Sequence, residues 1–403
     1  MRNFLFCLLL LVALGLSPVM AYAQEEAPDP STTARIHFGP LALNPTIGIS
    51  NVGIDTNVFN TWDDPKQDFT ATVTPGTDLW LQAGRTRLSG RANVGYVYFQ
   101  QYSQERSFNT DLSARYEVNL YHVRPYAIVS YLNTRERPGF EIDARARRFE
   151  HAYGFGADVP LTSRTTFGVE ARRQATSYAA DALFLGTYLR DVFDRREDTL
   201  QASVHYKLTP LTTFVVQASA ERARFTYSPV RNSDAVRVMP GVEFNAFAII
   251  QGSAYVGLRK LDMLGQGIPS YKGAVASVDL GYTLLGATRF AVQANRDVYY
   301  SFEVSWPYYV QTGFTASATQ RIAGPFDAQA RIGRQTLAYP LVGQSSFNVG
   351  RTDVVRFYGG GVGYRFGRSA RLGFNVDSYQ RTSPISTRTY KGLRIGSSLT
   401  YGF

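Results

Sequence analysis

The side chains that could do chemistry in this sequence are charged residues that alternate with apolar ones. In the segment 199–208, His205 and Lys207 alternate with Val204 and Tyr206. Such side chains on one hydrated face can attract, orient and repel ions without breaking a covalent bond. The candidates of this kind are Arg87, Arg91, Arg115, Glu117, Glu170, Arg172, His205, Lys207, Glu221, Arg237, Asp327, Arg331 and Arg394.

Motifs for catalysis, metal binding or cofactor binding are missing from the sequence. The four histidines have no His-x-x-x-His spacing, and no Gly-x-Ser-x-Gly nucleophile signature occurs. The single cysteine, Cys7, lies close to the start of the chain. The glycine run 359–363 lies inside an alternating segment and has no helix after it, so it does not resemble a nucleotide-binding loop. We therefore expect no enzyme, no metal site and no cofactor.

The elements that must position the charged residues are β-strands. Period-two alternation recurs from about residue 41 to the end, which is typical of strands with one apolar face. Eight short turns and nine long polar connections alternate along the chain. This asymmetry predicts an all-β fold, a transmembrane antiparallel barrel of about 18 strands, with 16 as the alternative and both termini in the periplasm.

The first residues are typical of a secretory signal. Arg2 precedes an apolar stretch from Phe4 to Leu16, and small residues end at Ala23. We expect a signal peptide over 1–23, a periplasmic leader over 24–40 and the barrel over 41–403. Together with the predicted barrel, a cleaved signal predicts the outer membrane of a Gram-negative-type bacterium, and nucleic acid is not an expected partner.

The size of the chain favours a membrane barrel over a water-soluble sandwich or a solenoid. One packed core rarely grows beyond roughly 250–300 residues, and the sequence shows no domain boundary and no fixed internal repeat. In a wide barrel the apolar face contacts lipid, and the polar face lines a lumen filled with water. The charged candidates then line the pore. Their positive surplus suggests a mild preference for anions, although the charges could equally form ion pairs that keep the wall hydrated.

The longest connection, from Ala175 to Glu197, carries apolar residues at helical spacing. It could form a short helix that narrows the mouth of the barrel, or an outer loop packed on its neighbours. An aromatic cluster over 299–309 fits an aromatic girdle at the membrane surface, or alternatively a path for sugars. The candidate residues of the constriction are Leu185, Leu189, Arg190, Val192, Phe193 and Arg195.

The end of the chain carries Leu399, Tyr401 and Phe403 at alternate positions. This pattern resembles the C-terminal assembly signal of bacterial outer-membrane β-barrels. The segments 43–59, 85–90 and 296–301 resemble a β-barrel porin family, some of whose members are linked to exopolysaccharide export. The resemblance implies an outer-membrane location and recognition by the barrel assembly machinery of that membrane.

Two functions therefore stay open at this point. One is a porin-like channel for polar solutes, including saccharides. The other is a conduit for exopolysaccharide export that works with periplasmic and inner-membrane partners. A structural or adhesin barrel without an open pore is less favoured. Outer-membrane lipid and lipopolysaccharide are expected partners in each case.

Overall fold

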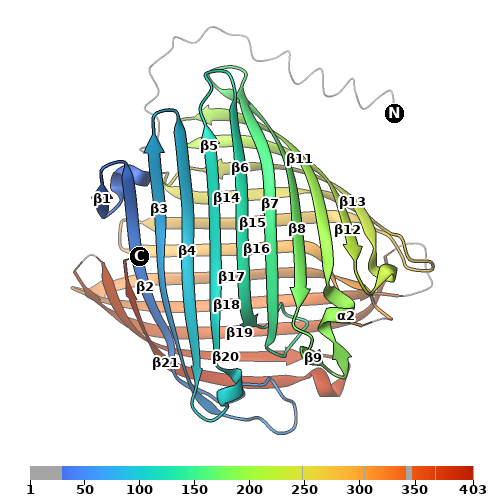
Figure 1. The fold of residues 1–403 in the computed structure, drawn as a ribbon. Coiled ribbons are helices and arrows are strands. Elements are labelled where there is room, and N and C mark those ends of the chain that lie inside the picture. The colour runs from blue at the N-terminus through green and yellow to red at the C-terminus, as the bar shows by residue number, and fades with distance from the viewer. Residues whose placement is uncertain (1–29, 247, 304, 342–346, 368, 403) are drawn as a thin grey trace.

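Eighteen long antiparallel strands form one closed sheet in the computed structural model, which describes residues 30–402 apart from 247, 304, 342–346 and 368 (Figure 1). The strands are β2 (Leu41–Asp55), β3 (Asp68–Ala83), β4 (Thr86–Phe99), β5 (Ser107–Val118), β6 (Arg124–Glu136), β7 (Ala146–Pro160), β8 (Thr165–Tyr178), β11 (Arg195–Thr209), β12 (Thr212–Phe225), β13 (Ser233–Phe244), β14 (Ile250–Met263), β15 (Tyr271–Leu284), β16 (Thr288–Tyr300), β17 (Tyr308–Ala323), β18 (Phe326–Pro340), β19 (Val349–Phe366), β20 (Ala370–Thr382) and β21 (Tyr390–Tyr401).

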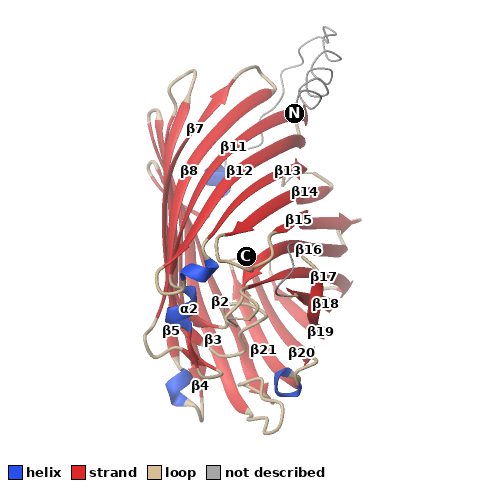
Figure 2. Cartoon of the chain, turned by 90° about the vertical axis from the view of Figure 1, so that its right-hand side faces the viewer, coloured by secondary structure: helices blue, strands red, loops and turns tan. Residues whose placement is uncertain are grey.

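The barrel is closed by pairing of its first and last strands. β21 pairs antiparallel with β20 on one side and with β2 on the other, with Ile49 opposite Leu399 and Asp55 opposite Arg394. Every other strand pairs with its neighbours in the chain, and Figure 2 shows β11 to β18 side by side in one wall. The prediction of an 18-stranded antiparallel barrel is confirmed, and the 16-stranded alternative is wrong.

The connections follow the alternation expected from the sequence. Short turns join β3 to β4 and β17 to β18, where Gly84 and Gly324 have φ values of +56° and +53°. Glycine adopts this left-handed conformation without the steric cost of a Cβ. The long connections lie at the other end of the barrel, which we call the long-loop end. Because β2 runs from the short-turn end and β21 returns to it, the described N- and C-terminal residues lie at that end.

The two faces of the wall differ in polarity. Large apolar side chains remain exposed on the outside, including Phe155 at 68%, Leu200 at 57% and Leu258 at 65%. Alternate positions carry charged residues that pair with one another across the inner wall, such as Arg115 with Glu117, Arg259 with Glu221 and Arg331 with Asp377. An apolar exterior around a polar interior is the arrangement that a bilayer requires of a wide barrel.

A few smaller elements accompany the barrel. The strand β1 (Ile36–Phe38) pairs with the start of β2, so part of the leader expected over 24–40 adds to the sheet. The connection between β8 and β11 contains β9 (Leu183–Phe184), β10 (Thr187–Tyr188) and the helix α2 (Leu189–Phe193). In the part of the chain that the structure describes, no helix is long and apolar enough to cross a membrane. The signal peptide expected over 1–23 lies outside the described residues.

Candidate functional site

The inner face of the barrel carries a lattice of ion pairs and is the candidate site. On β5, Arg115 lies 3.2 Å from Glu117 and 3.4 Å from Asp158 of β7. The hydroxyl of Tyr126 donates to Glu170 over 3.0 Å. Opposite charges therefore lie side by side on this wall and pair locally.

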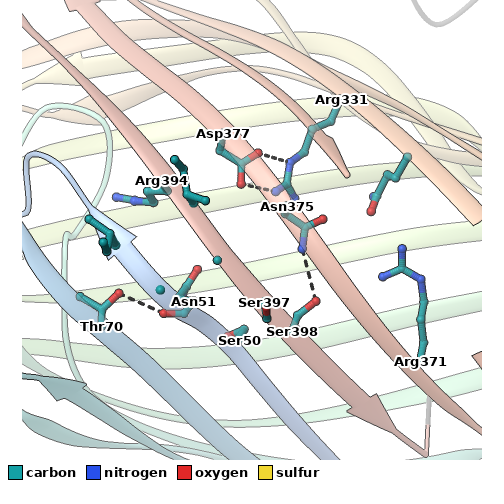
Figure 3. A pocket seen from close by; sticks show the side chains of 15 residues that line it. Ser50, Asn51, Thr70, Arg331, Arg371, Asn375, Asp377, Arg394, Ser397 and Ser398 are labelled. Atoms are coloured by element: carbon teal, nitrogen blue, oxygen red, sulfur yellow. Dashed lines mark hydrogen bonds and ion pairs between the residues drawn. The ribbon is translucent and has the colours of Figure 1, made fainter. Parts of the chain in front are cut away.

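A second part of the lattice lies beside the junction of β2 and β21, in a pocket of about 210 Å³ (Figure 3). There Arg331 binds Asp377, with 2.7 Å between Nε and Oδ1, and the amide of Asn375 donates to Ser398. The glycine run of β19 makes room for these side chains, because a Cβ on Gly359 would clash with both Asp377 and Arg331. The glycines expected inside a strand therefore serve the packing of the inner wall.

Four charged residues meet where β12, β13, β14 and β16 face the lumen. Arg259 lies 2.6 Å from Glu221 and 2.7 Å from Asp297, and Arg237 lies 3.3 Å and 2.9 Å from the same two acids. This four-membered network links β12 to β16 across the three strands that lie between them. Each cation therefore has two acidic partners, which offsets much of the cost of withdrawing it from water.

The tip of the β16–β17 hairpin leaves the wall and turns into the lumen. Pairing between β15 and β16 ends at Ala276 and Arg296, whereas pairing between β16 and β17 continues to Tyr300 and Tyr308. The turn beyond is held by Arg231, which donates to the carbonyl oxygens of residues 301, 302 and 303 over 2.9–3.1 Å. Arg231 belongs to η3 (Pro229–Arg231), which precedes β13. The hairpin tip thus extends across the mouth from β16 towards β13.

The β6–β7 connection reaches the opposite wall. The carboxylate of Glu141 accepts hydrogen bonds from the hydroxyl of Ser301 (2.6 Å), the backbone N–H of Phe302 (3.1 Å) and the hydroxyl of Tyr339 (3.0 Å). Tyr339 lies on β18, which is nine strands from β7 counted in either direction around the 18-stranded order. Glu141 is only 2% exposed. One side chain therefore joins three segments across the full width of the barrel.

Further charges surround this contact and complete what we call the mouth plug. Arg381 lies 2.5 Å from Asp353 and 3.0 Å from Asp143, and Arg351 lies 2.8 Å from both Asp353 and Glu303. The mouth plug comprises four acids and four arginines, Glu141, Asp143, Glu303, Asp353, Arg231, Arg351, Arg381 and Arg388. Their formal charges cancel, and the loop backbone is fixed because Arg381 and Arg388 also donate to the carbonyl oxygen of Glu141.

The β8–β11 connection packs against the same plug. Leu189 of α2 is fully buried, in a cluster that includes Ile142 of the β6–β7 connection and Phe184 of β9. Phe184 and Phe302 meet edge to face, with 4.9 Å between ring centroids, and the guanidinium of Arg388 lies 5.2 Å from the Phe184 ring. This connection therefore covers the plug from one side with an apolar layer.

Burial changes the acid–base behaviour of two plug residues. It raises the pKa of the Glu141 carboxyl to about 7, although the hydrogen bonds from Ser301 and Phe302 and the charge of Arg388 act against it. It lowers the pKa of the Arg231 guanidinium to about 10. Glu141 therefore has a protonation state that changes close to neutral pH.

The structure places the residues expected in the pore as follows. Arg115, Glu117, Glu170, Glu221, Arg237, Asp327, Arg331 and Arg394 take part in inner-face ion pairs or hydrogen bonds, and Arg91 pairs with Asp78. Arg172 borders two inner-face pockets, and Arg87 lies on the same face of β4 as Arg91. His205 is 3.2 Å from the hydroxyl of Ser203 and two residues from Lys207. In the described part of the chain neither Arg172 nor Lys207 has an acid within 4.0 Å.

The expected constriction residues lie in or beside the covering layer. Leu189, Val192 and Phe193 are buried in α2, whereas Leu185 is 60% exposed and Arg190 pairs with Asp191 near the surface. Arg195 pairs with Glu197 at the start of β11. The girdle interpretation of the aromatic cluster is wrong for Phe302, Tyr308 and Tyr309, which are at most 5% exposed inside the mouth. Leu399 and Tyr401 lie on β21, and Phe403 is outside the described residues.

The mouth plug itself was not found from the sequence. Its members come from four connections and the ends of two strands, and Glu141 and Tyr339 are 198 residues apart. The available signal was weak. The segment 137–145 carries Phe140 and Ile142 in a connection that would otherwise be expected to face water, and apolar loop residues indicate a partner surface.

Comparison with known proteins decides the family. A family model described as "Putative beta-barrel porin 2" matches residues 29–403. The chain belongs to this porin family. It is therefore a porin-like channel of the outer membrane, as the resemblance of its sequence segments implied.

Solved barrels of similar class include the outer-membrane protein OpdK from Pseudomonas aeruginosa, with a TM-score of 0.48, 10% identity, and coverage of 89% of this chain and 98% of that one. A BenF-like porin from Pseudomonas fluorescens Pf-5 has a TM-score of 0.47 and 10% identity, and the match covers 90% of this chain and 98% of that one. The search of curated proteins gave no significant match. Among the residues that the structure describes, no three His, Cys, Asp or Glu side chains are grouped to hold a metal ion.

Proposed function

We propose that this porin passes small hydrated solutes, saccharides among them, and that the mouth plug controls their access. The observation that carries the proposal is the contrast between the wall of the lumen and its long-loop end. The wall is a polar lattice of both signs, whereas the long-loop end is crossed by buried contacts between Glu141, Ser301 and Tyr339. A solute can pass only where those contacts open or where space remains beside them.

Liposome swelling tests this function. Vesicles that contain the full chain should swell in isotonic arabinose or glucose faster than empty vesicles, and the rate should fall with increasing size of the sugar. Absence of swelling with every sugar and of ion conductance in planar bilayers would favour a barrel without an open pore.

The export alternative is less supported. An extended polysaccharide chain would need the mouth plug to be displaced completely, which breaks the ion pairs of Arg351, Arg381 and Arg388 at the same time. A small solute needs only a local opening of the loops. No contact among the described residues specifically favours the export role.

We also propose that the long-loop end faces the outside of the cell and both termini face the periplasm, as the asymmetry of turns in outer-membrane barrels suggests. Cleavage of the signal after Ala23 and recognition by the barrel assembly machinery belong to the same proposal. A cysteine at exposed Asp63, in the β2–β3 connection, should react with an impermeant maleimide on intact cells. Labelling that appears only after the outer membrane is broken would reverse the orientation.

A further inference from the structure

Two arginines oppose each other on the outer face of the barrel, where lipid is expected. Arg334 of β18 is directly paired with Arg356 of β19, and the same row continues through Gln380 of β20 to Lys391 of β21. Like charges at directly opposite positions of two strands repel each other and destabilise the pair. A bound anion beside these residues would offset the repulsion.

The orientation of these side chains follows from their neighbours along the strands. Ile332 and Tyr358, two residues from Arg334 and Arg356, are 48% and 51% exposed on the apolar exterior. Arg331 points to the other face, where it binds Asp377. The cationic row thus lies on the lipid side of the wall.

The acidic side chains of the neighbouring strands face the lumen and do not reach this row. The acids of β17 to β21 are Asp327, Asp353 and Asp377, and each binds arginines on the inner side. Over the described residues, Arg334, Arg356 and Lys391 have no carboxylate within 4.0 Å. This distinguishes them from the inner-wall arginines, most of which are paired.

The height of the row matches the edge of the apolar band. On β19 the outward positions from Tyr358 to Phe366 carry Tyr358, Val362, Tyr364 and Phe366, each at least 37% exposed. These nine residues, at about 3.4 Å each and a tilt of about 40°, span about 23 Å along the barrel axis, close to the roughly 25 Å band of a membrane barrel. Arg356 is the next outward residue on the long-loop side. Its charge therefore lies at the level of lipid headgroups.

We propose that Arg334, Arg356 and Lys391 form a binding site for the phosphate groups of lipopolysaccharide. Guanidinium groups suit phosphate because they offer two parallel N–H donors, and Arg296, one row nearer the mouth, adds a further cation. The acyl chains would lie along Ile332, Tyr358 and Leu393 in the row beneath. The assignment rests on the proposed orientation, because lipopolysaccharide is confined to the outer leaflet.

Native mass spectrometry of the full chain in detergent, titrated with purified diphosphoryl lipid A, tests the site. The double variant Arg334→Gln/Arg356→Gln should bind lipid A at least tenfold more weakly than the wild type. The control Arg85→Gln/Arg164→Gln removes the same charge from turns at the opposite end and should leave binding unchanged. Gln380→Glu, which places an acid directly opposite Arg356 and retains both arginines, should weaken binding in the same direction and covers the case in which the double variant fails to fold.

Several results would overturn the proposal. Undiminished lipid A binding by folded Arg334→Gln/Arg356→Gln and by Gln380→Glu would exclude the site. Equally tight binding of phosphatidylglycerol, or of lipid A stripped of phosphate, would exclude its assignment to lipopolysaccharide phosphate. Labelling of Asp63→Cys only from the periplasmic side would do so as well. Ion conductance in planar bilayers is recorded in parallel, so that loss of the channel function is seen separately from loss of lipid binding.

Discussion

Removal of the Glu141 carboxylate should open the mouth plug. The variant Glu141→Ala deletes an acceptor that joins Ser301, Phe302 and Tyr339 across the lumen. A hydrogen bond inside a protein contributes about 0.5–1.5 kcal/mol net, and the Glu141 carboxyl accepts three of them. The backbone contacts of Arg381 and Arg388 with residue 141 persist in the variant, so the loss for the closed state is that of the three hydrogen bonds, about 3 kcal/mol at about 1 kcal/mol each. That loss shifts the equilibrium between the closed and open states of the mouth plug roughly a hundredfold towards the open state.

Single-channel recording in planar bilayers measures this shift directly. The variant should show a higher conductance or a much larger open fraction than the wild type. Glu141→Gln is the matched control, because the amide oxygen can still accept from Ser301 and Phe302, and its effect should be smaller. Wild-type conductance and gating in Glu141→Ala, with the barrel folded, would refute the assignment of Glu141 as the contact that holds the mouth closed.

Two further predictions concern the mouth plug, and a third concerns the charges of the inner wall. In the closed state the pKa of Glu141 is raised to about 7 from its ordinary value of 4.5, so the closed state holds a proton that a hydrated carboxyl would release. Closure should therefore be strongest below about pH 4.5 and be lost as the pH rises through 7. The fraction of open channels should rise between pH 5 and pH 8, and Glu141→Gln should abolish this change. Phe184→Ala removes a ring that packs on Phe302 and should raise conductance noise, with exposed Leu185→Ala as the control without effect. Reversal potentials in asymmetric salt should show a mild anion preference that Arg172→Gln/Lys207→Gln reduces, and a cation preference of the wild type would contradict the assignment.

Alternation along the strands was sufficient to predict the barrel. The polarity of residues such as Leu200 and Gln201 depends only on whether each faces lipid or water. Because successive side chains of a strand point to opposite faces, this polarity alternates with a period of two along the sequence. The lengths of the connections then gave the number of strands. The inner face could be predicted for the same reason, because parity along a strand assigns Arg115 and Glu117 to one side together.

The mouth plug could not be predicted in this way. A loop has no fixed period, so the sequence does not reveal that Glu141 reaches Tyr339 on the opposite wall. The aromatic cluster shows the same limit. Tyr308 and Tyr309 continue the alternation of β17, but the hairpin bends inward beyond Arg296, and both rings are buried in the mouth. The strands could thus be predicted from local alternation, whereas the loop contacts form only between segments that the closed barrel brings together.

Cysteine accessibility along β11 tests the central claim, which is a water-filled lumen enclosed by an apolar exterior. The only native cysteine, Cys7, lies in the expected signal peptide, so single cysteines can be introduced without interference. In liposomes, Gln201→Cys and His205→Cys should react with a water-soluble maleimide, whereas Leu200→Cys and Val204→Cys should react only with a lipid-soluble one. Equal reactivity of all four positions with the water-soluble reagent, or the reverse pattern, would contradict the account.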